Sequence, residues 1–403
     1  MLCGAQNKVK HISGSRHLRI LIIHNAYQQA GGEDTVQRNE AELLRRAGHI
    51  VESLIVSNDN ISSYKSRITT ALAASYNLGG KALVSGAINR FRPDVVHVHN
   101  TFPRLSPSVF DACSKAGVPV VWTLHNFRIT CANGILLRSG LPCEDCVGNA
   151  PLSAIRHRCY RGSAIGSASV AAMIWTHQLR GTWHSKVDRF IALTHFARDK
   201  FIAAGLPSER IVVKPNFSED PLAEVEDVPV ERRGALFVGR LSAEKGVDVL
   251  VDAWRDMGAL LTIIGDGPQR PALEAKAGSE VQFLGHHDRA YVQNAMRRAA
   301  LLVVPSVWFE MYPMTVVEAM ACGTPVVASR IGALAEIVQE GVTGFHFSPG
   351  DAHDLSCVVR HVLANPEEMA RIGANARSYY KDKLAPEANI VALERIYNEV
   401  IEQ

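Results

Sequence analysis

Short apolar runs alternate with helical stretches along the first half of the chain. The run LRILIIH at residues 18–24 is typical of a strand buried on both faces, and residues 33–47 follow with a helical pattern that ends at Gly48. Because this alternation places helices over both faces of a parallel sheet, the first half is predicted to be an α/β domain. Further strands are expected at residues 51–56, 94–99, 118–124, 187–193 and 210–213.

The alternating pattern stops at residues 215–233 and then restarts. This stretch, PNFSEDPLAEVEDVPVERR, has three prolines and many carboxylates but no sustained apolar period, which is typical of a domain linker. We therefore predict two Rossmann-like α/β domains, at residues 18–214 and 234–380, with a C-terminal helix within residues 381–403. The strands expected in the second domain are 235–238, 260–264, 281–284, 301–304, 325–328 and 344–347, with helices at 245–257 and 268–276.

Charge and cysteine content exclude several classes of protein. Residues 1–17 lack an apolar run and are predicted to be a disordered extension, not a secretory signal. A net charge of +3 is too small for a nucleic-acid binder. Eight cysteines without an export signal predict reduced thiols and a cytoplasmic location.

The segment PSVWFEMYPMTVVEAMACGTPVVAS, at residues 305–329, predicts a short helix with a binding site at its start. Pro313 suits the first helical turn, and Gly323 suits the stop. The free N–H groups of that turn, around Met314 and Thr315, together with the helix dipole, form an anion site.

Two acids bracket this anion site. Glu310 is expected in the loop before the helix, and Glu318 about 7.5 Å along the helix axis from Pro313. Carboxylates at two depths can hold two parts of one polyhydroxylated ligand. The alternative, two ordinary solvated acids, fits less well because the segment is largely apolar.

Two cationic residues are expected at the carboxyl edge of the second sheet. In FVGRLSAEKGV a strand ends at Gly239, so that Arg240 and Lys245 emerge where open α/β folds bind ligands, and both suit a diphosphate. The turn GDGP at Gly265 permits close backbone approach. Each motif alone is also compatible with a surface turn.

Taken together, these motifs resemble a known family. The E-x7-E pair Glu310 and Glu318, the GRL-x3-KG of residues 239–246 and the GDGP turn are similar, in order and spacing, to family 4 retaining glycosyltransferases. The resemblance extends from residue 18 to the C-terminal helix. It implies the GT-B fold, in which two Rossmann-like domains face each other across a cleft, but it does not identify the substrate.

The resemblance implies a role for each residue of the second domain. Arg240 and Lys245 would neutralise the donor diphosphate in place of a divalent metal, so that no catalytic cofactor is required. Glu318 would accept hydrogen bonds from the ribose hydroxyls, and Glu310 would lie near the transferred sugar. The family usually has glycine after the first acid, where this chain has Met311.

In the first domain, Gly31 and Gly32 resemble the glycine loop that approaches the donor phosphate and the acceptor. The alternative is that they only turn the chain into its helix. His125 stands where the family often has a histidine near the donor sugar, although a lone histidine at a strand end is more often a packing residue. Asn126 and Arg128 are candidate acceptor contacts.

The family implies transfer of a sugar, with retention, from a UDP- or GDP-sugar to a glycan or lipid-linked acceptor, as in surface-polysaccharide assembly. The departing phosphate would accept the acceptor's proton; if Glu310 were instead a nucleophile, a covalent sugar adduct should be trappable. Three alternatives stay open. They are an idle nucleotide-sugar-binding subunit, an epimerase or phosphorylase on this scaffold, and a nicotinamide dehydrogenase, although the first βα turn lacks G-x-G-x-x-G.

Four cysteines within a predicted insertion at residues 128–161 suggest a structural zinc site. Their spacing is C-x11-C-x2-C-x12-C, with one CEDC knuckle. Buried free thiols and a redox pair are the alternatives. The cysteines are Cys131, Cys143, Cys146 and Cys159.

A basic run at residues 156–161 precedes an uncharged stretch from Gly162 to Leu179. That stretch is long enough to cross a bilayer, but its polar and small residues favour a buried or interfacial helix. The arrangement is compatible with peripheral contact with an anionic bilayer, at the inner face of the membrane, or with a lipid-diphosphate acceptor. The alternative is a buried helix with a solvated basic flank.

Overall fold

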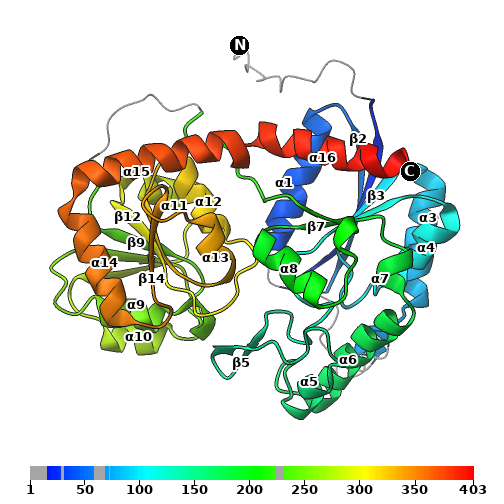
Figure 1. Cartoon of the computed structure of the whole chain (residues 1–403), viewed down its shortest axis with the longest axis horizontal. Helices are drawn as coiled ribbons and strands as arrows, with labels where there is room; N and C mark the ends of the chain where they lie inside the picture. Colours follow the sequence, from blue (N-terminus) through cyan, green and yellow to red (C-terminus); the bar gives the residue numbers. More distant parts are fainter. Residues whose placement is uncertain (1–15, 29–30, 59–68, 72, 224–230) are drawn as a thin grey trace.

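The computed structural model describes residues 16–28, 31–58, 69–71, 73–223 and 231–403, so part of the predicted extension and of the predicted linker lies outside the described residues. Two halves lie side by side, each built on a six-stranded sheet whose neighbouring strands are parallel (Figure 1). The predicted α/β class with two Rossmann-like domains is confirmed.

The first sheet has the order β2-β1-β3-β4-β7-β8. Its centre forms from apolar runs: residues 20–25 of β1 are all buried, and β1 pairs with β2 on one side and β3 on the other. The strands are β1 Arg19–Ala26, β2 Ile50–Ser57, β3 Val95–Asn100, β4 Val120–Thr123, β7 Arg189–Ala192 and β8 Ile211–Val213. The helices are α1 Gly32–Arg46, α3 Leu78–Phe91, α4 Val109–Ala116, α5 Leu152–Arg156, α6 Ala164–Leu179, α7 Thr182–Ser185 and α8 His195–Ala203.

The second sheet has the order β11-β10-β9-β12-β13-β14, which is the 3-2-1-4-5-6 order of the Rossmann fold when counted from its own first strand. Its strands are β9 Ala235–Val238, β10 Leu261–Ile264, β11 Val281–Gly285, β12 Leu301–Val304, β13 Val326–Ser329 and β14 Gly344–Phe347. Its helices are α9 Val247–Ala253, α10 Arg270–Lys276, α11 Arg289–Arg298, α12 Met314–Ala321, α13 Gly332–Ile337, α14 Ala352–Ala364 and α15 Pro366–Tyr379.

The C-terminal segment crosses from the second half to the first. After α15, a π-helical turn at Tyr380–Leu384 leads into α16, Pro386–Ile401, and this segment runs along both halves (Figure 1). Apolar side chains of α16, including Leu393 and Tyr397, pack with Leu18 of the first half. The last helix therefore completes the core of the first half.

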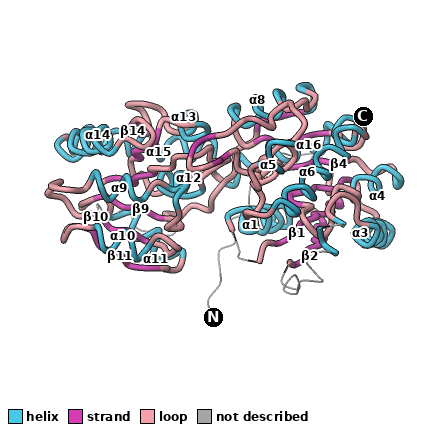
Figure 2. Tube along the Cα trace, turned by 90° about the horizontal axis from the view of Figure 1, so that it is seen from below, coloured by secondary structure: helices cyan, strands magenta, loops and turns pink. Residues whose placement is uncertain are grey.

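The carboxyl edges of the two sheets face each other. Phe196, which follows β7, and Phe309, which follows β12, have ring centroids 4.9 Å apart. Glu336 of α13 accepts hydrogen bonds from the backbone N–H groups of His195 and Phe196, each at 2.8 Å. Figure 2 also places α8 and α13 at the junction of the halves. Because ligands of such sheets bind at the carboxyl edges, both candidate half-sites open toward this junction.

Two expectations about helices in the second half need correction. The helix expected at residues 245–257 is a 3-10 turn at Ala243–Lys245 followed by α9, because Gly246 between them has a φ of +64°. A Cβ on Gly246 would lie 2.1 Å from the carbonyl oxygen of Pro305, so this position is closed to other residues. Pro313 lies immediately before α12 and not within its first turn.

The uncharged stretch forms α6, whose one face is buried and whose other face is exposed, in agreement with an interfacial helix. Among the described helices, none has the length and apolar character needed to cross a membrane.

Candidate active site

The loops after β9 and β10 are locked together at the carboxyl edge of the second sheet. The N–H of Gly239 donates to the carbonyl oxygen of Ile264 at 3.0 Å. Gly265 has a φ of +138°, and a Cβ there would lie 1.9 Å from the carbonyl oxygen of Gly239. Gly265 therefore has a structural reason to be glycine, and its contact with Gly239 fixes where Arg240 leaves the sheet.

The two predicted cations each have a carboxylate partner. Lys245 Nζ lies 2.6 Å from Glu310 Oε1, which also accepts a hydrogen bond from the Ser306 hydroxyl at 2.7 Å. Arg240 pairs with Glu244 at 2.7 Å, and its side chain is 63% exposed. Glu310 is thus buried and held in place by two hydrogen bonds, whereas Arg240 is exposed and would exchange its partner Glu244 for an incoming anion.

The start of α12 lies beside this pair. The first N–H groups of the helix, those of Met314 and Thr315, have no acceptor within the helix, so they present a partial positive charge. Glu318, one turn further, is half-buried, and burial raises its pKa. Its charged neighbour is Arg289 of α11, 3.9 Å away, a residue that the sequence analysis did not single out.

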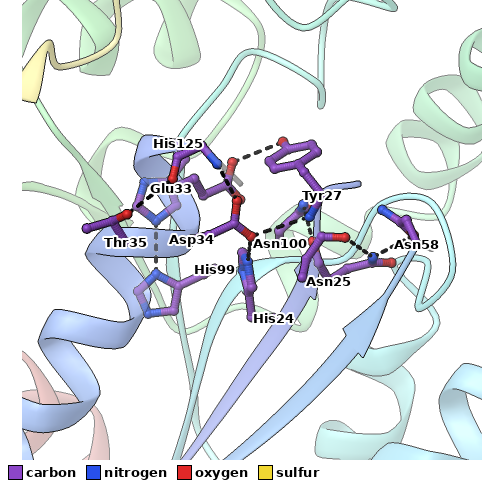
Figure 3. Close-up of polar contacts among 12 residues, drawn as sticks. His24, Asn25, Tyr27, Glu33, Asp34, Thr35, Asn58, His99, Asn100 and His125 are labelled. Atoms are coloured by element: carbon purple, nitrogen blue, oxygen red, sulfur yellow. Dashed lines mark hydrogen bonds and ion pairs between the residues drawn. The ribbon is translucent and has the colours of Figure 1, made fainter. Parts of the chain in front are cut away.

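In the first half, the glycine loop turns into α1 and is held by one carboxylate. Asp34 accepts hydrogen bonds from the backbone N–H groups of Gly31 (2.8 Å) and Tyr27 (3.3 Å), and its other contact is His24 Nε2 at 2.8 Å (Figure 3). Among the described residues, no atom lies within 4 Å of a Cβ placed on Gly32. The protein itself therefore does not require glycine there, in keeping with close approach by a ligand.

A second acid, Glu33, lies at the start of the same helix. Its Oε2 accepts hydrogen bonds from the Tyr27 hydroxyl at 3.0 Å and the Asn126 amide at 3.4 Å (Figure 3). Burial raises the pKa of Glu33 to about 8, so its carboxyl group is mostly protonated at neutral pH. The glycine loop and Asn126 are thereby joined in one polar network.

His125 is the end of a buried chain of polar groups. His125 Nε2 lies 2.9 Å from His99 Nδ1, and His99 Nε2 lies 3.6 Å from Glu40 Oε2. Glu40 in turn forms a 2.7 Å ion pair with Lys214, and both side chains are buried. Burial lowers the pKa of His99 and of His125 well below the usual histidine value, so both rings are neutral. Each ring then carries one proton, and the chain determines which nitrogen holds it.

His97 packs against His99, with ring centroids 4.3 Å apart and the ring planes tilted by 36°. Its Nδ1 contacts the Tyr397 hydroxyl of α16 at 2.7 Å, and its Nε2 contacts the Thr123 hydroxyl at 2.8 Å. Burial lowers the pKa of His97 to about 4. Both ring nitrogens of His97 are hydrogen-bonded, one of them to the last helix. This histidine therefore has a fixed position, against which His99 packs.

Glu40, His97 and His99 form a compact group whose ligand atoms lie within 4.8 Å of one another, which is a spacing that could hold a metal ion. The Lys214 ammonium, however, already supplies a cation 2.7 Å from Glu40. The two nitrogens of His97 are also taken by hydroxyl groups. The group therefore fits an ion pair with packed histidines better than a metal centre.

Arg128 lines a pocket in the first half, and three contacts hold its side chain in place. Its Nη1 donates to the carbonyl oxygen of Ala132 at 2.5 Å, and its guanidinium lies over the rings of Phe102 and Tyr160, 4.8 and 5.5 Å from their centroids. His125 and Asn126 line the same pocket, together with apolar side chains that include Met173 of α6. The three residues predicted for the sugar and the acceptor are thus brought together.

The buried chain behind His125 was missed by sequence analysis. One signal was present, because His97 and His99 are two residues apart in a strand and so share one face of the sheet. Lys214 and Glu40 gave no such signal: a lysine after a strand and an acid within a polar helical stretch are both ordinarily exposed.

The arrangement defines a class of protein. Two Rossmann-like domains with facing carboxyl edges, and a lysine–carboxylate pair at a helix start, constitute a GT-B glycosyltransferase architecture. Solved structures agree on the fold. An Anabaena protein, HepE in complex with UDP, matches with a TM-score of 0.65 at 19% identity, covering 94% of this chain and 100% of that one. A glycosyltransferase from Rickettsia africae matches with a TM-score of 0.69 at 19% identity, covering 96% and 99%.

Family models match both halves. Residues 31–216 match the glycosyl transferase 4-like domain, and residues 219–379 match glycosyl transferases group 1. The chain belongs to this family of glycosyltransferases, as its motifs predicted.

Curated relatives are similar over part of their length. An uncharacterized glycosyltransferase of Methanocaldococcus jannaschii is 29% identical over 57% of this chain and 66% of its own length. A glycogen synthase of Mycobacterium tuberculosis is 37% identical over 35% of this chain and 36% of its own length. A phosphatidyl-myo-inositol mannosyltransferase of Mycobacterium leprae is 30% identical over 49% and 56%. The matches therefore span less than two thirds of these relatives.

Proposed function

We propose that this protein transfers a sugar, with retention, from a UDP- or GDP-sugar to an acceptor held by its first half. The observation that carries the proposal is the Lys245–Glu310 pair beside the start of α12, with the exposed Arg240 at the same edge. UDP as donor nucleotide is supported by the solved HepE complexes, which contain UDP or UDP-glucose.

The geometry supports a mechanism that needs no metal. As the glycosidic bond breaks, negative charge grows on the departing diphosphate, where Arg240, Lys245 and the N–H groups of α12 stabilise it most strongly in the transition state. Glu318 would hold the ribose, and Glu310 the transferred sugar. The acceptor hydroxyl would attack from the side that the diphosphate leaves and pass its proton to that phosphate, so no carboxylate nucleophile is required.

The test is nucleotide binding followed by turnover. UDP, GDP and ADP are compared by thermal shift, and a matching base should raise Tm because a ligand at 100 times its Kd adds about 2.7 kcal/mol of stability. The corresponding sugar nucleotide should then release free nucleotide when acceptor is added. Tight binding without turnover on glycan and lipid-linked acceptors would favour the idle binding subunit, and failure of every nucleotide to bind would contradict the proposal.

We further propose that the acceptor is lipid-linked and is met at an anionic membrane surface, as in surface-polysaccharide assembly. The exposed face of α6 carries a stripe of apolar side chains three and four residues apart, formed by Ile165, Ala168, Ala172, Trp175 and Leu179. Of these, Ile165 is 80%, Trp175 41% and Leu179 78% exposed. No acidic residue occurs between Asp145 and Asp188.

Basic residues flank the stripe at both ends of α6. Arg156, Arg158 and Arg161 are exposed before the helix, and Arg180 is exposed after it. Apolar side chains that enter the interface and cations that meet lipid headgroups are the two requirements of a surface-bound helix. The buried face of α6 contributes Met173 to the pocket of Arg128, so the helix connects that surface with the proposed acceptor site.

Liposome flotation tests the membrane proposal. The wild type is expected to float with vesicles that contain anionic lipid, and the double variant Ile165→Gln/Leu179→Gln to lose most of this binding. The control Leu78→Gln/Leu83→Gln, which changes two exposed leucines of α3, should bind as the wild type does. Equal flotation of both variants, or none for the wild type, would exclude α6 as the membrane contact.

A further inference from the structure

The four cysteines of the insertion converge on one pocket. They come from separate points of the chain: Cys131 follows the turn at residues 127–130, Cys143 and Cys146 follow a small hairpin, and Cys159 follows α5. All four line the pocket and all are free thiols. We propose that these four side chains bind one zinc ion, which fixes the insertion and, through it, Arg128.

The backbone around the central pair suits a metal knuckle. The hairpin consists of β5 Leu137–Arg138 and β6 Leu141–Pro142, and leads directly into Cys143. A tight turn follows, in which the N–H of Val147 donates to the carbonyl oxygen of Glu144 at 2.9 Å. Cys-x2-Cys on such a turn supplies two thiolates to one ion, and the two distant cysteines complete the set of four that structural zinc requires.

The insertion has too little core to hold this shape by itself. Its strands are two residues long and its helix has five residues. The insertion contributes three buried residues, Ala132, Cys146 and Ala154, to the cluster beneath it and three more, Ile129, Cys131 and Leu136, to the main core of the first half. The described cysteines form no disulfide. Small, loop-rich segments of this kind usually need a covalent or metal cross-link.

Two charged side chains also line the pocket. Arg138 and Asp145 form an ion pair with each other there, so their charges offset. The ligand set of the proposed site is therefore the four sulfur atoms.

Zinc binding requires a contraction of the site. Among the described residues, no three of the four sulfur atoms lie within 4.8 Å of one another, whereas Zn–S bonds of about 2.3 Å would hold all four closer. Cys143 and Cys159 are half-exposed, on short connections that can move inward. Cys131 and Cys146 are buried and form the fixed side of the site.

Arg128 depends on residues that adjoin the cysteines. The carbonyl oxygen that it contacts belongs to Ala132, next to Cys131, and the ring of Tyr160 beneath it is next to Cys159. Fixing both cysteines therefore fixes two of the groups that hold Arg128, the Ala132 carbonyl and the Tyr160 ring. The part that Arg128 plays in acceptor binding rests on the proposed function, whereas zinc binding does not.

Metal content of the full chain tests the proposal. Protein purified under thiol-reducing conditions is expected to contain about one zinc per chain. Cys146→Ser and Cys159→Ser should each lower the content at least about twofold, while Cys357→Ser, which changes an exposed cysteine outside the insertion, should not.

A second measurement covers variants that fail to fold. Chelation of zinc from the wild type should speed tryptic cleavage at Arg138 and Arg156 about tenfold, and added zinc should reverse this. Less than about half an equivalent of zinc, with no uptake of added zinc, would overturn the proposal, as would iron with visible absorbance or disulfides among these cysteines. Nucleotide-induced thermal shifts report on the second half of the protein. Their presence or absence therefore tests the proposed function and not the zinc site.

Discussion

Replacement of Arg240 and Lys245 together by glutamine is expected to lower kcat/KM for sugar transfer by about 100-fold or more. Both side chains stand at the carboxyl edge of the second sheet, where the departing diphosphate would gain charge. Glutamine removes the positive charge and keeps a polar side chain, although one that is shorter than lysine or arginine. Initial rates of nucleotide release and Kd for the free nucleoside diphosphate should both be measured, and we expect both to worsen.

The control for this variant also removes two positive charges from the second half. Arg255 and Lys276 both contact Asp252 and lie far along the chain from the helix start of α12. Arg255→Gln/Lys276→Gln should leave kcat/KM within about twofold of the wild type, because surface pairs contribute about 0–1 kcal/mol. Because Lys245 also holds the buried Glu310, unfolding should be followed in parallel. Unchanged affinity and transfer in the first double variant would refute the proposed donor site.

Replacement of Lys214 by methionine is expected to destabilise the protein by about 3–5 kcal/mol. Methionine retains most of the buried stem, but it leaves the Glu40 carboxylate, which is fully buried, without its cation. Among the described residues, neither Glu40 Oε2 nor His99 Nε2 has a hydrogen-bond partner. No neighbouring group would therefore stabilise the carboxylate that the substitution leaves unpaired. Urea-induced unfolding, compared at one temperature and pH, measures this loss.

The double variant Lys214→Met/Glu40→Gln removes both charges and should recover a large part of the lost stability. Arg90→Gln breaks an exposed ion pair with Glu52 and should cost at most about 1 kcal/mol. If Lys214→Met lowers the free energy of unfolding by less than Arg90→Gln does, the buried pair does not stabilise the fold. Activity of the double variant would also report on His125, because the chain that orients His99 would then be altered.

Much of the fold could be predicted because it depends on local patterns. The run at residues 18–24 became β1 shifted by one or two residues, and β12 and β14 have the expected bounds. The residues proposed for the donor side came from motifs that are each contiguous in sequence. Lys245 and Glu310 were both proposed from these motifs, but their ion pair was not predicted, since 65 positions separate them.

The rest of the site depends on contacts that no local pattern encodes. Lys214 meets Glu40 across 174 positions, and His97 meets Tyr397 across 300. In each case a residue type that is common on surfaces becomes buried because a distant segment covers it. The helix at residues 247–253 was expected to be longer because hydrophobic periodicity does not reveal the contact of Gly246 with Pro305.

The return of the last helix to the first half gives the molecule two adjacent chain crossings instead of one. The outgoing and returning segments are joined by hydrogen bonds. The N–H of Ser218 donates to the carbonyl oxygen of Leu384 at 3.3 Å, and the Tyr380 hydroxyl donates to the carbonyl oxygen of Ser218 at 2.8 Å. Arg377 also binds both carboxylate oxygens of Asp220, at 2.8 and 2.7 Å. Two bonded crossings restrain the rotation of one half against the other more than a single crossing would, so they help to fix the position of Glu310 relative to His125.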